Sequence, residues 1–125
     1  LGDPETEVIV SMEPEQFALS ILKAYGKESL DEYTPKCCAV DVVVASEGYP
    51  ESPKKGQEIR FQEGGFFFYG GVNEKNGKLV VSGGRVLHSM GIGGNLQEAR
   101  EHAYKNINNV YFDGMYYRTD IAGNE

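Results

Sequence analysis

The residues best suited to binding an anion are Ser82, Gly83, Gly84 and Arg85, which follow one another in the chain. Two residues without side chains would let a ligand reach the backbone N–H groups, while the guanidinium forms paired hydrogen bonds with a phosphate or a carboxylate. The same four residues are also typical of a turn or β-bulge whose arginine points into water. Spacing alone favours the turn, and the anion site stays the alternative.

A second glycine-rich stretch, residues 91–94, precedes a segment with helical periodicity. A phosphate-binding loop at a helix N-terminus has a similar composition, but it continues into a Lys-Ser or Lys-Thr pair, which this sequence lacks. We therefore predict an ordinary strand-to-helix connection at this point.

The two histidines, His88 and His102, belong to no Cys-x-x-Cys or His-x-x-x-His pattern, which argues against a structural zinc site. His88 shares a predicted strand face with Val86 and Met90, so we predict partial burial and a hydrogen bond. His102 is predicted on a helix surface, in contact with solvent. Because no nucleophile stands near a base in the sequence, we assign no catalytic residue and no metal ligand.

Cys37 and Cys38 are adjacent, and neighbouring side chains on a strand point to opposite faces. A disulfide between them would be strained, and there is no third cysteine to pair with either. The sequence also shows no basic segment followed by an apolar leader. We therefore expect two reduced thiols in a cytoplasmic protein.

The charge balance limits the partners. The chain of 125 residues has 12 Lys and Arg against 19 Asp and Glu, a net charge of −7, whereas a general nucleic-acid binder needs an excess of cations. Its apolar runs are far shorter than the roughly 18 residues of a membrane span. We expect neither nucleic acid nor a membrane as partner. The 16 glycines indicate many turns and favour a β-rich structure.

The first 35 residues are predicted to hold one short strand, one helix and a polar linker. Residues 8–10 are β-branched and suit the strand. Pro14 is suited to the first position of a helix that Gly26 would end. The linker is expected over residues 27–35. The apolar side chains that share one face of this helix are Ala18, Ile21, Leu22 and Tyr25.

The middle of the chain reads as a series of strands. The pair Asn76-Gly77 suits the positive φ angles of a tight hairpin, which we expect to join residues 66–72 to residues 78–82. The other predicted strands are residues 37–46, 58–61 and 85–92.

A helix is predicted after the last strand. Asn95 is a suitable N-cap with Glu98 three residues later, as in a capping box. The aromatic tail, residues 111–121, is expected to pack back as an extended segment. The fold class is therefore α+β and rich in strands. The buried stripe of the helix is predicted to comprise Leu96, Ala99, Ala103, Ile107 and Val110.

Several stretches together resemble one enzyme family. The opening residues 1–7 contain Gly-Asp-Pro-Glu followed by Thr and Glu, and the other matching stretches are residues 43–50 with 55–56, 82–87, 98–104 and 112–121. In this order they are similar to the phosphoribosylamine–glycine ligase (glycinamide ribonucleotide synthetase) family.

The resemblance implies two parts. Residues 1–35 would be the end of an ATP-grasp domain with a linker helix. Residues 36–125 would be the C-terminal domain of the synthetase, a small antiparallel sheet rolled into a partial barrel with one flanking helix. The chain would then be a C-terminal fragment that begins just inside the family's signature.

The resemblance also implies an activity. The family joins 5-phosphoribosylamine to glycine at the expense of ATP, through a glycyl phosphate, in de novo purine synthesis, with Mg²⁺ or Mn²⁺ as cofactor. The metal ligands precede the signature, so Asp3 and Glu5 are expected near the metal without ligating it. We expect this chain alone to bind neither ATP nor metal and to be inactive.

In related enzymes, basic residues on the corresponding strand hold the substrate phosphate. The resemblance therefore favours a phosphate-binding role for Arg85, assisted by Ser82, Gly83 and Gly84, with Lys55 as a weaker candidate. Two residues depart from the expected pattern, Glu47 in place of a small residue or lysine and His88 in place of glycine or alanine.

The alternative is a non-catalytic binding or interaction module, similar to the barrel-like C-terminal domain of biotin carboxylase. Such a module would bind a partner as an isolated chain, whereas a ligase fragment would need its other domains.

Overall fold

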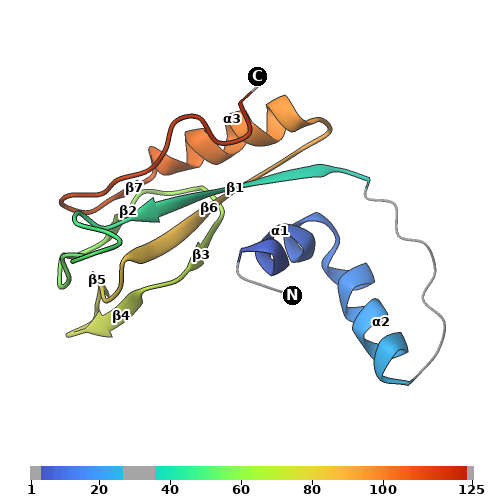
Figure 1. The fold of residues 1–125 in the computed structure, drawn as a ribbon, viewed down its shortest axis with the longest axis horizontal. Coiled ribbons are helices and arrows are strands. Elements are labelled where there is room, and N and C mark those ends of the chain that lie inside the picture. Colours follow the sequence, from blue (N-terminus) through green and yellow to red (C-terminus); the bar gives the residue numbers. More distant parts are fainter. Residues whose placement is uncertain (1–3, 27–35, 124–125) are drawn as a thin grey trace.

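The computed structural model describes residues 4–26 and 36–123, with backbone only for residues 16, 17, 20 and 23–25. The predicted linker, residues 27–35, lies outside these ranges. The helices and strands follow the order α1 (Glu5–Met12), α2 (Pro14–Tyr25), β1 (Cys38–Ala45), β2 (Arg60–Phe61), β3 (Phe67–Tyr69), β4 (Val72–Lys75), β5 (Lys78–Val81), β6 (Arg85–Gly93), α3 (Leu96–Ile107) and β7 (Val110–Tyr111) (Figure 1).

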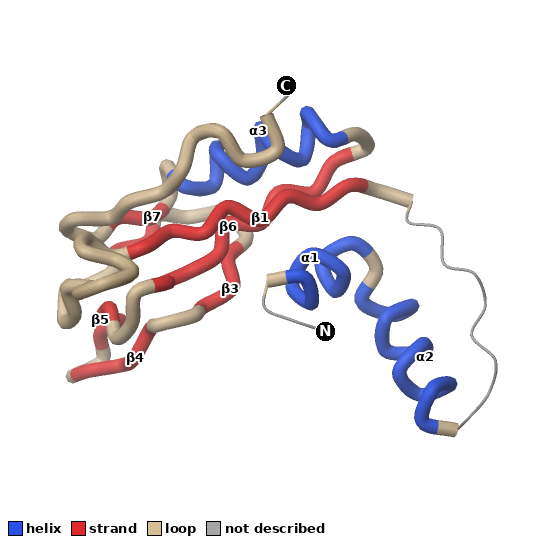
Figure 2. Tube along the Cα trace, in the orientation of Figure 1, coloured by secondary structure: helices blue, strands red, loops and turns tan. Residues whose placement is uncertain are grey.

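The main sheet has the order β1-β6-β3, and both of its pairings are antiparallel. Two smaller antiparallel pairs, β2 with β7 and β4 with β5, complete the strands (Figure 2). Within the described residues these sheets do not close into a barrel. The predicted α+β class and the antiparallel pairing are confirmed, and α3 is the predicted flanking helix.

Helices cover the two faces of the main sheet. Adjacent residues of a strand point to opposite faces. Ser89 donates a hydrogen bond of 2.6 Å to the carbonyl of Ala103, which places α3 on one face. The neighbouring His88 has its Nδ1 atom 3.0 Å from a carboxylate oxygen of Glu7, which places α1 on the other face. Figure 1 shows this arrangement, with the strands between α3 and α1.

The core lies between α3 and the main sheet. Alternate residues of β1 are buried because the strand presents every second side chain to α3. Among the described residues, the buried apolar side chains are Val40, Val42, Val44, Ala45, Ile59, Val81, Val86, Leu87, Met90, Ala99, Ala103, Ile107, Val110 and Phe112.

Helix α3 begins as predicted. The Asn95 side chain accepts a hydrogen bond of 2.9 Å from the N–H of Glu98, and the Glu98 carboxylate accepts one of 2.9 Å from the N–H of Gly94. The predicted stripe is wrong at both ends. Leu96 is 48% exposed, and Val110 is buried but belongs to β7, because the helix ends at Ile107.

The N-terminal segment is helical at residues 8–10, where a strand was predicted. Residues 8–10 lie within α1, which begins after Pro4 with Glu5 and Glu7 in its first turn. Acidic residues at a helix N-terminus and packing against the sheet outweigh the strand preference of the β-branched run. Helix α2 begins at Pro14 and ends before Gly26, as predicted. On its apolar face, Ile21 is 52% and Leu22 is 66% exposed.

The hairpin at residues 76–77 is confirmed. Asn76 and Gly77 have φ angles of 53° and 75°, and they join β4 to β5. The predicted strand over residues 66–72 is wrong in extent. It divides at Gly70-Gly71, so that β3 pairs with β6 while β4 pairs with β5.

The aromatic tail packs back on the domain as predicted. Phe112 is fully buried, and Tyr116 forms an isolated antiparallel bridge with Ala45 at the end of β1. Cys37 and Cys38 are free, as expected. No helix in the described ranges has the length and apolar character that crossing a membrane requires.

Candidate functional site

The loop of residues 82–85, here called the Gly–Arg loop, connects β5 to β6 and is held on both sides by backbone hydrogen bonds. The N–H of Ser82 donates to the carbonyl of Gly71 (2.7 Å), and the N–H of Gly71 donates to the carbonyl of Arg85 (2.7 Å). On the other side, the carbonyl of Gly84 accepts from the N–H of Ser46 (2.8 Å). The loop is therefore fixed in position before any ligand binds.

Close packing explains two of the glycines around this loop. A Cβ atom on Gly84 would overlap the ring of Tyr49. A Cβ atom on Gly71 would lie 2.5 Å from the Cα atom of Gly83, a separation that real Cβ atoms do not show. The N–H of Ser82 is also engaged inside the protein. Ser82 can therefore approach an anion only through its hydroxyl group.

Arg85 and Lys55 lie near the same end of the domain. Arg85 opens β6, pairs with Ala45 and is exposed. Lys55 is exposed on the loop before β2, and the N–H of the next residue, Gly56, donates to the carbonyl of Val81 (2.7 Å). The structure thus brings the backbone at Lys55 beside the end of β5, directly before the Gly–Arg loop. All five predicted site residues lie in these two neighbouring loops.

An acidic residue stands close to this basic region. The carboxylate of Glu47 lies 2.7 Å from Nζ of Lys54, and both side chains are exposed. The hydrogen bond and charge of Glu47 raise the pKa of the Lys54 ammonium above its usual value. Because Glu47 neutralises Lys54, we do not add Lys54 to the predicted anion-binding residues.

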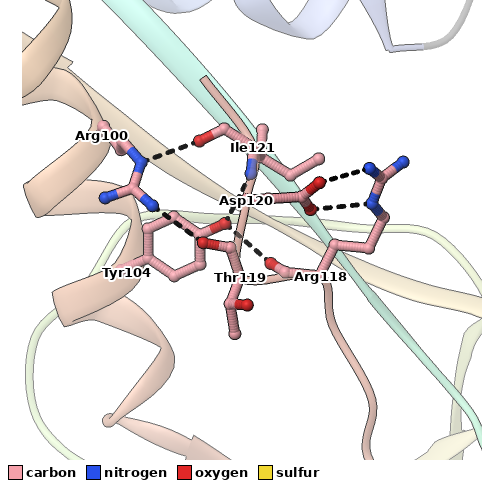
Figure 3. A network of polar contacts seen from close by, with 6 residues as sticks. All are labelled: Arg100, Tyr104, Arg118, Thr119, Asp120 and Ile121. Carbon is pink, nitrogen blue, oxygen red and sulfur yellow. Dashed lines mark hydrogen bonds and ion pairs between the residues drawn. The ribbon is translucent and has the colours of Figure 1, made fainter. Parts of the chain in front are cut away.

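The tail is tied to α3 by a network of polar contacts (Figure 3). Arg100 donates to the carbonyls of Ile121 (3.0 Å) and Thr119 (2.8 Å), and its guanidinium lies 4.9 Å from the ring centre of Tyr104. The Tyr104 hydroxyl donates to the carbonyl of Arg118 (2.7 Å) and accepts from the N–H of Ile121 (3.1 Å). The spacing of these residues in the sequence does not indicate this network. They position the tail through its backbone.

Arg118 and Asp120 form a bidentate ion pair next to this network, and both side chains are exposed (Figure 3). The two nitrogen–oxygen distances are 2.9 Å and 2.6 Å. The hydrogen bond from Arg118 lowers the pKa of the Asp120 carboxyl, and the same pairing raises the pKa of the Arg118 guanidinium. Both groups are exposed, so water screens much of the attraction.

An apolar cavity of about 200 Å³ lies between β1 and the tail. It opens beside the sheet face that α1 covers, because Asp41 and Val43 point to that face together with His88. The side chains that line it are those of Asp41, Val43, Ala45, Tyr49, Tyr116, Tyr117, Arg118 and Ile121.

His88 is hydrogen-bonded as predicted, but it is fully buried where partial burial was predicted. Its side chain is 2% exposed, and its Nδ1 atom lies 2.9 Å from Asp41 and 3.0 Å from Glu7. The sequence did not indicate this convergence because the three residues come from β6, β1 and α1. His102 is exposed as predicted but also bonds through Nδ1 to the carbonyl of Ile92 (2.6 Å).

Comparison with known proteins decides the family. Residues 39–124 match the family described as the phosphoribosylglycinamide synthetase C domain. The chain belongs to this family.

Relatives of the synthetase C domain match almost the whole chain. A phosphoribosylamine–glycine ligase of Thermotoga maritima is 52% identical over 122 residues, which are 98% of this chain and 30% of the relative. The corresponding enzyme of Caldanaerobacter subterraneus subsp. tengcongensis is 43% identical and is also covered over 30% of its length. A bifunctional purine biosynthetic protein of Pichia angusta is 38% identical.

A crystal structure of the Thermotoga maritima ligase superimposes with a TM-score of 0.92 at 51% identity, over 97% of this chain and 31% of that one. This similarity confirms the fold expected for a synthetase C domain. The chain spans about 30% of the length of the curated ligases that it matches.

Proposed function

We propose that the chain is the C-terminal part of an ATP-dependent ligase in purine biosynthesis. The ligase would join 5-phosphoribosylamine to glycine, giving glycinamide ribonucleotide, ADP and phosphate. The observation that carries the proposal is the match of 98% of the chain, at 52% identity, to a protein named for this reaction. In the division that we propose, residues 1–35 are the end of the ATP-grasp domain and residues 36–125 are the C-terminal domain.

In this proposal Arg85 binds the phosphate of 5-phosphoribosylamine. A guanidinium can form two parallel charge-assisted hydrogen bonds with a phosphate, which suits an exposed arginine on a loop already fixed by hydrogen bonds. The Ser82 hydroxyl and the Lys55 ammonium would assist, while Gly83 and Gly84 keep the loop clear of side chains. No residue of this chain is proposed to move a proton or to form a covalent bond.

ATP and its Mg²⁺ or Mn²⁺ would be held by other parts of the ligase. Asp3 lies outside the described residues, and Glu5 is exposed at the start of α1. In residues 4–26 and 36–123, Glu5 joins no group of three metal-ligating side chains. The residues present therefore do not fit a magnesium–ATP site, and we propose no step through it. The free thiols support the cytoplasm as the location that we propose.

An assay of ligation tests the function. The complete ligase carrying this sequence is incubated with ATP, glycine and 5-phosphoribosylamine, and glycinamide ribonucleotide and ADP are measured by chromatography. We expect both products in equal amounts, and none from residues 1–125 alone. Absence of glycinamide ribonucleotide with the complete protein would overturn the proposal. Binding of a macromolecular partner by the isolated chain would then favour a non-catalytic module.

A further inference from the structure

Three side chains that can ligate a metal meet at the contact between α1 and the main sheet. Glu7 comes from α1, Asp41 from β1 and His88 from β6. Their ligand atoms all lie within 4.8 Å of one another. The site is largely closed to solvent, because the side chains of His88, Asp41 and Glu7 are 2%, 4% and 22% exposed.

Hydrogen bonds alone do not satisfy these three side chains well. The Nδ1 atom of His88 lies 2.9 Å from Oδ2 of Asp41 and 3.0 Å from Oε2 of Glu7. An imidazole nitrogen carries at most one hydrogen, so one N–H would have to serve two carboxylates. Two carboxylates close together in a largely closed site repel each other, and a divalent cation between them would replace this repulsion with attraction.

Asp41 gives a second, independent indication. Its Oδ1 atom is buried and has no hydrogen-bond partner among the described residues. Buried carboxylate oxygens are nearly always satisfied, so an unpartnered one points to an ion or a water molecule at this place. Asp41 also lines the 200 Å³ cavity, which gives a small ion a route to the buried carboxylate.

We propose that Glu7, Asp41 and His88 bind a divalent transition-metal ion, for which Zn²⁺ is the best match. One imidazole nitrogen and two carboxylate oxygens form a three-residue zinc set, with water or the free Asp41 oxygen as the fourth ligand. In a tetrahedral zinc site, ligand atoms about 2.0–2.2 Å from the ion lie about 3.3–3.6 Å apart. The observed separations of 2.9 Å and 3.0 Å need to grow by only a few tenths of an ångström.

The ion would join α1 to the sheet. Glu7 belongs to α1, whereas Asp41 belongs to β1 and His88 to β6. One ion would therefore link a helix that precedes residues 27–35 to two strands that follow them. Such an ion would have a structural role, because its three ligands would hold α1 against β1 and β6. It would differ from the metal expected with ATP, whose ligands the family resemblance places before the signature.

Binding can be measured on the 125-residue chain and on the complete ligase. Each protein is stripped with EDTA and titrated with ZnCl₂ in a calorimeter, and CoCl₂ is used to obtain a visible spectrum. We expect one ion per chain, a rise in Tm with Zn²⁺ and the absorption of tetrahedral Co²⁺. Asp41→Asn and Glu7→Gln should each weaken binding by at least about tenfold. The exposed Glu74→Gln, which removes the same charge from β4, should leave binding unchanged.

Glu7→Gln is the decisive variant, because α1 lies outside the core and its loss should leave the strands folded, as circular dichroism would verify. Three results would overturn the proposal: no saturable binding of Zn²⁺ to the complete ligase, equal affinity of wild type and Glu7→Gln, or a Co²⁺ spectrum identical to that of free hexaaqua Co²⁺. A Tm that responds to pH but not to Zn²⁺ would show instead that His88 binds only a proton.

Discussion

Gly91 of β6 lies directly against the backbone of Ala103 in α3. A Cβ atom at Gly91 would come well within 3.0 Å of the Ala103 amide nitrogen and of the Ala99 carbonyl oxygen. The close approach lets Ser89 and Asn106 bond across the interface, to the carbonyls of Ala103 (2.6 Å) and Met90 (2.7 Å). The helix therefore rests on the strand with no side chain between them at this point.

Gly91→Ala should destabilise the domain by about 3 kcal/mol or more, because the added methyl group meets backbone atoms that cannot rotate away. Urea unfolding followed by circular dichroism measures this change. The matched control is Gly94→Ala, whose Cβ atom would approach only the flexible end of the Glu98 side chain at 3.4 Å. Equal stability of the two variants would contradict the packing described here.

The N-cap of α3 gives a second prediction. Asn95→Ala removes the acceptor of the Glu98 N–H and should cost about 1 kcal/mol in the free energy of unfolding. Asn95→Ser restores an acceptor and should recover most of the loss. If alanine and serine at position 95 give the same stability, the side-chain cap contributes nothing.

Helix α3 also shows what local patterns can predict. Asn95 and Glu98 specify its start because capping acts within one turn, and the Asn76-Gly77 turn is equally local. The strand predicted over residues 8–10 is wrong because the conformation of this segment depends on its packing against the sheet. The spacing of Glu7, Asp41 and His88 in the sequence could not predict that they lie together, because they belong to three separate elements. Grouping of the predicted phosphate-site residues at one end was foreseeable only through the family resemblance.

The tail network predicts a local effect. Tyr104→Phe removes the hydroxyl shared by the Arg118 carbonyl and the Ile121 N–H, at a cost of about 1 kcal/mol. The amide of Ile121 should exchange with deuterium faster, while amides of β6 should keep their protection. Unchanged exchange at Ile121 would show that the hydroxyl does not hold the tail.

The ion pair of Arg118 and Asp120 predicts a dependence on pH. The hydrogen bond from Arg118 lowers the pKa of the Asp120 carboxyl below its ordinary 3.8. The stabilising contribution of the pair is therefore present above about pH 4 and lost as the pH falls through the lowered pKa. An NMR titration of the Asp120 carboxyl carbon should give a lower midpoint in the wild type than in Arg118→Gln. Equal midpoints would contradict the pairing.

Arg85 carries the central claim, that this domain binds the phosphate of the ligase substrate. The most direct test compares Arg85→Ala with Arg60→Ala, a control that removes an exposed arginine from β2, in the complete ligase. We predict that the KM for 5-phosphoribosylamine rises about tenfold or more in Arg85→Ala, the loss expected for a charge-assisted contact, while the KM for ATP stays unchanged. Arg60→Ala should behave as wild type. An unchanged KM for 5-phosphoribosylamine in Arg85→Ala would contradict the account.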